Sequence, residues 1–308
     1  MDLQPNLQVL FAYDGTAACA RGGAALAQLA ASWELSTTLV HVAPPGRSAD
    51  EGRRLLEAFV PAVERTQRCR RLLLENADPA GAIGELCANG PFDVVLAPAS
   101  DRGVAGLWSA SLRARLMRRC AVPVLTMGRN VRPQREARAI RRVACLVDFD
   151  DHPERLVALA GQMATAARAR LVALTVVPSI HDGTHAEILG SRAPLTAADA
   201  RERLAALVGH LPGAQVQAGD GRREAALRAM LADSDADLLL VGRGGIGAGL
   251  WPHWFPRHLD RLPIPVMAFD PGAIAVDDWP FRWAASRRLH LVRARPVDVL
   301  DPAVPAGA

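Results

Sequence analysis

The stretch Val9-Leu10-Phe11-Ala12-Tyr13-Asp14 is a short hydrophobic strand that ends in an aspartate. The pattern returns in the second half of the chain as Val143-Ala144-Cys145-Leu146-Val147-Asp148, and an alanine-rich helical stretch follows each copy. The ends of the copies match too, because residues 118–127 and 260–269 both place a proline before a final apolar strand. A duplication of this length predicts two whole domains.

Length and composition fit this interpretation. The 308 residues suffice for two domains that each bury a core, and 50% of them are hydrophobic. No segment approaches the long uninterrupted apolar run that a membrane helix requires, and the first residues lack the pattern of a signal peptide. We therefore expect a soluble cytoplasmic protein with no membrane partner.

Two features of the composition argue against particular kinds of functional site. The 5 cysteines show no C-x-x-C spacing and lie mostly in apolar runs, which predicts small buried hydrophobes rather than a redox or zinc site. The chain contains no lysine, so all 36 of its Lys and Arg residues are arginines. A Walker A loop and a Schiff-base site both need a lysine and are therefore excluded.

Each half alternates strands and helices, which is typical of a parallel sheet covered on both faces. Strands are expected at 7–13, 38–42, 71–74, 93–97 and 122–127, and again at 143–148, 171–177, 214–218, 237–241 and 266–269. Helices are expected at 16–32, 50–67, 79–88 and 109–119 in the first half. The first helix of the second half should begin with Asp151 as its cap and Pro153 as its first residue.

These elements divide the chain into domains at 1–128 and 142–270, a linker at 129–141 and a tail at 271–308. The linker is rich in arginine and is expected to be solvated, with contact to an anion or a nucleic acid as the alternative. No aromatic residue lies among these arginines, which disfavours nucleic acid. The tail is expected to lie over a sheet edge or groove of its own protein, or else to bind a partner.

Several short motifs occur in a fixed order along the first half. They are Asp14-Gly15-Thr16, Leu39-Val40-His41-Val42, Asp78-Pro79-Ala80-Gly81-Ala82-Ile83 and Cys120-Ala121-Val122-Pro123-Val124. Together with the repeat of the pattern in the second half, they resemble a tandem protein of the universal stress protein family. The resemblance implies two doubly wound, parallel, five-stranded sheets of the Rossmann-like, adenine nucleotide alpha hydrolase-like kind. We expect the two domains to pack face to face as an internal pseudo-dimer, which would protect the edges of their last strands.

The resemblance also implies where a nucleotide would bind. In nucleotide-binding members, the aspartate of the first strand and the backbone of the second hold the adenosine, and a glycine loop after the fourth strand wraps the phosphates. Residues at the matching positions are Asp14, Val42 and Ser111 in the first half and Asp148, Val176, Gly242, Gly245 and His253 in the second.

The phosphate loop is degenerate in both halves. In the first half, both ways of aligning the loop lose its first two glycines, and Ser111 alone remains as a phosphate contact. The second half keeps Gly242 and Gly245 directly after a strand, but the aromatic segment 251–256 replaces the Gly-Ser helix start. His253 could replace the missing serine, and the alternative is that the aromatic residues fill the space of a triphosphate.

No catalytic or metal site is predicted. Asp148, Asp150, Asp151 and His152 could hold Mg²⁺, although helix capping and exposure in a turn also explain them. No nucleophile has a recognisable setting. We expect a non-catalytic stress-response or adaptor protein with at most residual nucleotide binding.

Two alternatives remain open. One is an adenine-nucleotide-binding regulator or slow ATPase that uses ATP with Mg²⁺ in the second domain. The other is a protein-interaction module that acts through the linker and the tail, with an unknown protein partner. A homodimer is compatible with each of these hypotheses.

Overall fold

The computed structural model describes residues 6–59, 69–98, 107–131, 138–178, 195–242, 261–270 and 299–300. For residues 107–111, 178, 299 and 300 it describes the backbone alone. Among the described residues, no helix is long and apolar enough to cross a membrane.

Strands and helices alternate in the first half, as predicted. The elements are β1 (Asn6–Ala12), α1 (Ala18–Ala30), β2 (Glu34–Ala43), α2 (Ala49–Ala58), β3 (Cys69–Glu75), α3 (Pro79–Asn89), β4 (Val94–Leu96), α4 (Leu107–Arg119) and β5 (Val124–Thr126).

The second half repeats this order. Its elements are β6 (Arg142–Leu146), α5 (Pro153–Ala166), β7 (Arg170–Pro178), α6 (Ala197–Val208), β8 (Gln215–Gly221), α7 (Arg223–Ser234), β9 (Leu238–Gly242) and β10 (Val266–Phe269). A last short strand, β11 (Val299–Leu300), comes from the tail.

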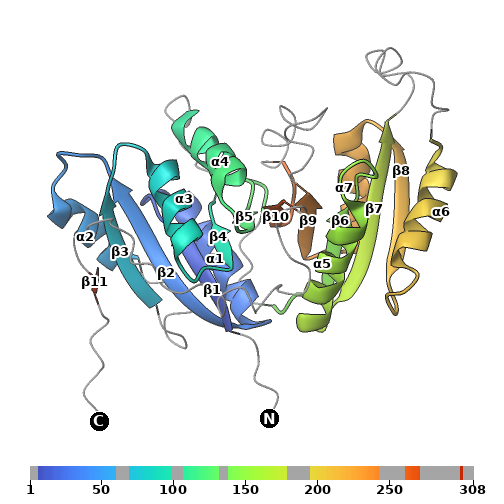
Figure 1. The fold of residues 1–308 in the computed structure, drawn as a ribbon, viewed down its shortest axis with the longest axis horizontal. Helices are drawn as coiled ribbons and strands as arrows, with labels where there is room; N and C mark the ends of the chain where they lie inside the picture. The colour runs from blue at the N-terminus through green and yellow to red at the C-terminus, as the bar shows by residue number, and fades with distance from the viewer. Residues whose placement is uncertain are drawn as a thin grey trace, which may run out of the picture.

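All of these strands belong to one sheet, with the order β11-β3-β2-β1-β4-β5-β10-β9-β6-β7-β8 (Figure 1). Within each half the first strand lies between the second and the fourth, which is the order of a doubly wound sheet. Neighbouring strands within each half are parallel. The predicted fold class is therefore confirmed.

The two halves join through their last strands. β5 and β10 pair antiparallel, with Leu125 opposite Met267, so the sheet runs without a break from one half into the other. The predicted internal pseudo-dimer is therefore confirmed, but its domains join edge to edge through their last strands and do not pack face to face. An open strand edge can also be protected by pairing with another edge, and the chain uses that solution.

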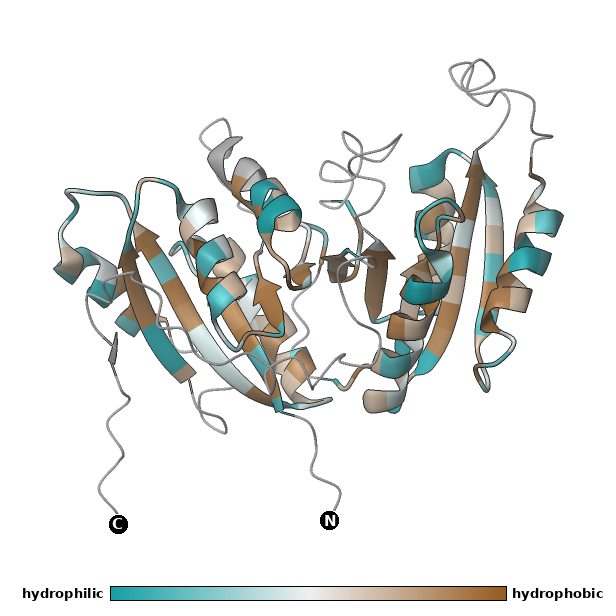
Figure 2. Cartoon of the chain, viewed as in Figure 1, coloured by the Kyte–Doolittle hydropathy of each residue, from teal (hydrophilic) through white to brown (hydrophobic). Residues whose placement is uncertain are grey.

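The hydrophobic core is also continuous. One cluster on one face of the sheet contains residues of α1, α2, α5 and α6, and a second cluster on the other face contains residues of α3, α4 and α7. Each cluster includes strand residues of both halves. Figure 2 shows this layering as hydrophobic strands between helices that turn hydrophilic residues outward.

Helix α5 begins at Pro153, as predicted, but its cap is not Asp151. The cap is His152, which adopts the left-handed conformation with φ 44° and makes no capping hydrogen bond with its side chain. Asp151 lies one residue earlier, and its amide donates to the carbonyl of Asp148.

The predicted linker and tail both contact the folded core where they are described. Ile140 is 2% exposed, and its amide donates to Ser32 Oγ at 2.9 Å. This residue of the linker is therefore packed, whereas its neighbours Arg138 and Arg141 are solvated as expected. In the tail, β11 pairs antiparallel with the outer strand β3. This pairing agrees with the expectation that the tail lies over a sheet edge.

Asp93 lies just before β4 and is 1% exposed. Its Oδ2 accepts a hydrogen bond from the amide of Gln8 at 2.8 Å, and its Oδ1 is buried without a partner among the described residues. Burial raises the pKa of this carboxyl to about 7, although the Gln8 bond lowers it. Asp237 holds the equivalent place before β9, where its Oδ2 accepts from the amides of Arg141 and Arg142 at 2.7 and 3.0 Å.

Met267→Ala should destabilise both halves, because Met267 is fully buried at the strand pair that joins them. We expect a loss of about 2–5 kcal/mol in the free energy of unfolding, measured in urea. Native-state hydrogen exchange should become faster in peptides from β4 as well as β9. Faster exchange in the second half alone would contradict a shared core.

Asp93→Asn should remove a pH dependence of stability. The unfolded pKa of aspartate is about 4, so the stabilisation from the protonated Asp93 is fully present below about pH 4 and is lost as pH rises through about 7. Across that window the stability difference between variant and parent should grow by roughly 1.4 kcal/mol per pH unit. Denaturant unfolding at several pH values measures it, and parallel curves would contradict the assignment.

Candidate functional site

The strand order places one candidate crevice in each half. In doubly wound sheets, ligands bind beyond the carboxyl ends of the strands where the strand order reverses. Here the reversal lies between β1 and β4 and between β6 and β9. Asp14 follows β1 and Asp148 follows β6, so both predicted aspartates lie at these points.

In the first half, the Asp14 side chain forms hydrogen bonds with residues at the start of α1. Its Oδ1 accepts hydrogen bonds from the amide and hydroxyl of Thr16 at 2.9 and 2.6 Å and from the thiol of Cys19 at 3.3 Å. Burial, together with the nearby Asp14 carboxylate, raises the pKa of Cys19 to about 12, so this thiol stays protonated and keeps donating. The aspartate thus holds the helix terminus in place.

Apolar side chains pack around the first-half crevice. The rings of Tyr13 and Phe59 lie 4.6 Å apart between centroids, and Phe11 meets Phe59 edge-on at 5.6 Å. Gly15 has φ +74°, and a Cβ there would lie 2.5 Å from Leu55 of α2. Leu55 of α2 therefore packs directly against the turn after β1.

The end of α2 is held in this position by a buried arginine. Arg71 of β3 donates from Nε to the carbonyl of Leu56 at 3.1 Å and from Nη2 to the carbonyl of Phe59 at 3.3 Å. These charge-assisted bonds satisfy carbonyl groups at the end of the helix. They fix Phe59 against Tyr13.

The backbone near the two crevices is nearly the same. The amide of Tyr13 donates to Val40 at 2.8 Å, and that of Val147 donates to Leu174 at 2.7 Å. In each half, the residue whose amide makes this bond also accepts a hydrogen bond at its carbonyl, from a side chain of the second strand. His41 Nδ1 donates to the Tyr13 carbonyl at 2.9 Å, and Thr175 Oγ1 donates to the Val147 carbonyl at 3.0 Å. The predicted adenosine contacts Val42 and Val176 each lie two residues beyond this crossing and are half-buried.

The second-half crevice has a charged character. Asp148 Oδ1 accepts from the amide of Asp150 at 3.1 Å, and Asp148 also interacts electrostatically with Arg223, the first residue of α7. Burial lowers the pKa of the half-buried Arg223 guanidinium, and Asp148 partly offsets that effect. The structure thus brings a half-buried cation to this crevice. Arg223 was not predicted from the sequence, because no motif marks the start of α7.

The remaining predicted residues are placed only in part. Gly242 ends β9, at the carboxyl edge beside β6. Gly245 and His253 lie outside the described residues, and Ser111 lies in α4, where the structure describes the backbone alone. Gly242 is thus the one predicted phosphate contact whose position the structure gives.

Asp78, from the third motif, has a structural role. Its Oδ1 accepts from the amide of Gly81 at 3.1 Å, which caps α3, and from Arg115 of α4. Its Oδ2 accepts from Arg119 at 2.8 Å. The Gly81 bond and the two arginines hold the pKa of Asp78 below its usual value. This carboxylate therefore ties α3 to α4.

No group of three or more histidine, cysteine, aspartate and glutamate side chains could hold a metal ion within the part of the chain that the structure describes. That part includes Asp148, Asp150, Asp151 and His152.

Two like-built halves, each with an aspartate at the point where strand order reverses, define a tandem doubly wound α/β protein. Residues 139–253 match the model of the universal stress protein family. The predicted resemblance to this family is therefore confirmed for residues 139–253, which make up most of the second half. A search among curated proteins finds no match.

Solved structures support the fold along most of the chain. A universal stress protein from Archaeoglobus fulgidus DSM 4304 is 14% identical, with a TM-score of 0.62 over 85% of this chain and 96% of that one. A functionally unknown protein from Pseudomonas aeruginosa PAO1 is 15% identical, with a TM-score of 0.52 over 90% and 96%. The cytoplasmic domain of a prokaryotic cation chloride cotransporter is 13% identical, with a TM-score of 0.50 over 91% and 99%. At these identities the likeness establishes the fold alone.

Asp14→Ala should destabilise the first half, because it removes the acceptor for Thr16 and Cys19 at the start of α1. We expect a loss of about 0.5–2 kcal/mol in the free energy of unfolding, measured in denaturant. Asp14→Asn keeps one acceptor oxygen and should lose less. Equal stability of the parent and the alanine variant would show that these bonds contribute nothing.

Proposed function

We propose that this chain is a non-catalytic stress-response or adaptor protein of the cytoplasm, with at most residual nucleotide binding in its second half. The observation that carries the proposal is the difference between the two crevices. The first is packed with its own side chains, and the second retains a charged pair. An adaptor of this kind acts by binding a protein partner.

The contacts of the first half support the loss of nucleotide binding there. Asp14 already accepts three hydrogen bonds from its own helix start. Leu55 of α2 and Phe59, which follows the helix, pack against the turn where a ligand of this fold would approach. A nucleotide would have to displace the end of α2 from its hydrogen bonds with Arg71, and that would disrupt the packing of a partly buried aromatic cluster.

A second candidate function is an adenine-nucleotide-binding regulator or slow ATPase that uses ATP with Mg²⁺ in the second half. Arg223 favours it, because a half-buried guanidinium beside Asp148 could bind phosphate oxygens in two-pronged fashion. Val176 and Gly242 would supply contacts for the adenosine and the phosphates, with Asp148 on the ribose. Gly245 and His253 would complete the phosphate loop.

Thermal melting with and without about 1 mM ATP and Mg²⁺ separates the two functions. Residual binding with a dissociation constant near 1 mM would stabilise the fold by about 0.4 kcal/mol, a rise of under about 2 °C in Tm. We expect this small rise and no phosphate release above background.

The matched variants are Arg223→Ala in the crevice and Arg228→Ala on the exposed side of the same helix. A rise of several degrees that disappears in Arg223→Ala and persists in Arg228→Ala would contradict the proposal. That outcome would establish the nucleotide-binding regulator.

A further inference from the structure

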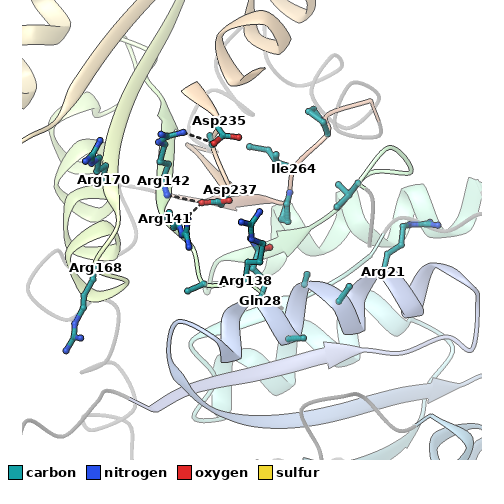
Figure 3. A pocket seen from close by; sticks show the side chains of 18 residues that line it. Arg21, Gln28, Arg138, Arg141, Arg142, Arg168, Arg170, Asp235, Asp237 and Ile264 are labelled. Atoms are coloured by element: carbon teal, nitrogen blue, oxygen red, sulfur yellow. Dashed lines mark hydrogen bonds and ion pairs between the residues drawn. The ribbon is translucent and has the colours of Figure 1, made fainter. Parts of the chain in front are cut away.

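A cavity of about 620 Å³ lies between the two halves (Figure 3). In the second half it lies at the opposite end of the strands from the crevice. It is lined by the starts of β6 and β7 and by the residues just before β9 and β10, which are the amino-terminal ends of parallel strands. One face of α1 lines it from the first half. Ligand pockets for small molecules span roughly 300–1,000 Å³, so the cavity has the size of a binding site.

Small and apolar side chains form two of its walls. Ala24, Ala25 and Ala27 of α1 face it from the first half, and Pro263, Ile264 and Pro265 face it from the second. The short alanine side chains keep the cavity open where a larger residue would fill it. These walls are suited to an uncharged part of a ligand.

The remaining lining is strongly basic. Two aspartates, Asp235 and Asp237, face six arginines. The six are Arg21, Arg138, Arg141, Arg142, Arg168 and Arg170.

Some of these arginines have a structural explanation. Arg142 donates to Asp235 at 2.8 Å and to the carbonyl of Ser234 at 3.2 Å. Its guanidinium group thus satisfies hydrogen-bond acceptors at the end of α7. Arg168 and Arg170 follow the end of α5, where positive charge complements the helix dipole. Asp237 is occupied by the amides of Arg141 and Arg142. Two aspartates against six arginines leave the lining with an excess of positive charge.

Arg138 and Arg141 are left without such an explanation. Both side chains are exposed, and their guanidinium groups form no hydrogen bond or ion pair with another described residue. Figure 3 shows them near the middle of the cavity, with Arg138 beside Gln28 of α1, whereas Arg21 and Arg168 point away from it. Because arginines outnumber aspartates in the lining, like charges there repel, and a bound anion relieves that repulsion.

We propose that this cavity binds a small molecule that carries two or more phosphate groups, and that Arg138 and Arg141 bind the phosphates. Guanidinium groups match phosphate oxygens in two-pronged hydrogen bonds. A cavity of this size between two halves fits a small ligand better than a nucleic acid, which needs an extended basic groove with aromatic residues. Among the described residues, the lining contains no aromatic side chain. Since the walls come from both halves, the bound ligand would also hold the halves together.

Calorimetric titration with inorganic tripolyphosphate tests the site, with orthophosphate and, at equal ionic strength, sulfate as comparisons. We expect saturable binding of one tripolyphosphate per chain, tighter than that of orthophosphate and weaker at high salt. The variant Arg138→Ala/Arg141→Ala should bind at least tenfold more weakly. It should still fold, because both side chains are exposed and the amide of Arg141 keeps its bond to Asp237.

A control variant, Arg201→Ala/Arg228→Ala, removes the same charge from exposed positions on α6 and α7 and should bind as the parent does. An equal loss in the control would mean a general effect of charge and would overturn the proposal. A loss of tripolyphosphate binding in Arg223→Ala but not in Arg138→Ala/Arg141→Ala would also overturn it, because it would place the phosphates in the second-half crevice. The proposed function and this inference can therefore fail independently.

Hydrogen exchange with and without tripolyphosphate locates the binding. We expect slower exchange at the end of α1 and at residues 138–142, on both sides of the cavity. Protection confined to other regions would overturn the assignment. Tighter binding of a short single-stranded oligonucleotide, through the same two arginines, would identify nucleic acid as the ligand and would also overturn it.

Discussion

The antiparallel pairing of β5 with β10 is the constraint on which the rest of the structure depends. It merges two five-stranded sheets into one, and it lets the core on each face continue from one half to the other. The same pairing brings the amino-terminal ends of the second-half strands near α1, where the cavity opens between them. Backbone hydrogen bonds of a short strand pair thus fix the two halves, and with them the two crevices, relative to each other.

Much of the fold follows from local sequence, because its strands are short apolar runs bounded by charges, glycines and prolines. The last strand, 266–269, was predicted with its observed bounds. The geometry of the join was not predictable in this way, since an apolar edge strand can be buried either by face packing or by edge pairing. The first residue of α5, Pro153, was predicted correctly. Its cap was not, because His152 occupies that position and histidine is not a residue that marks a helix start.

The site was harder to predict than the fold. The motifs located Asp14 and Asp148 at the correct strand ends, but the two aspartates have different surroundings that no local pattern records. Leu55 reaches the first crevice from a separate helix, and Arg223 reaches the second from the start of α7. Both contacts are tertiary, and they decide what each crevice can accommodate.

The joined sheet has a consequence for how the halves could diverge. In a symmetric dimer of identical chains, a side chain that blocks one pocket blocks both, so the pair cannot specialise. Here the two partners are covalently linked, and their pairing does not depend on protein concentration. One half can therefore lose its ligand site and keep only a structural role, as the packing of Phe59 on Tyr13 illustrates. The other half can still bind a ligand.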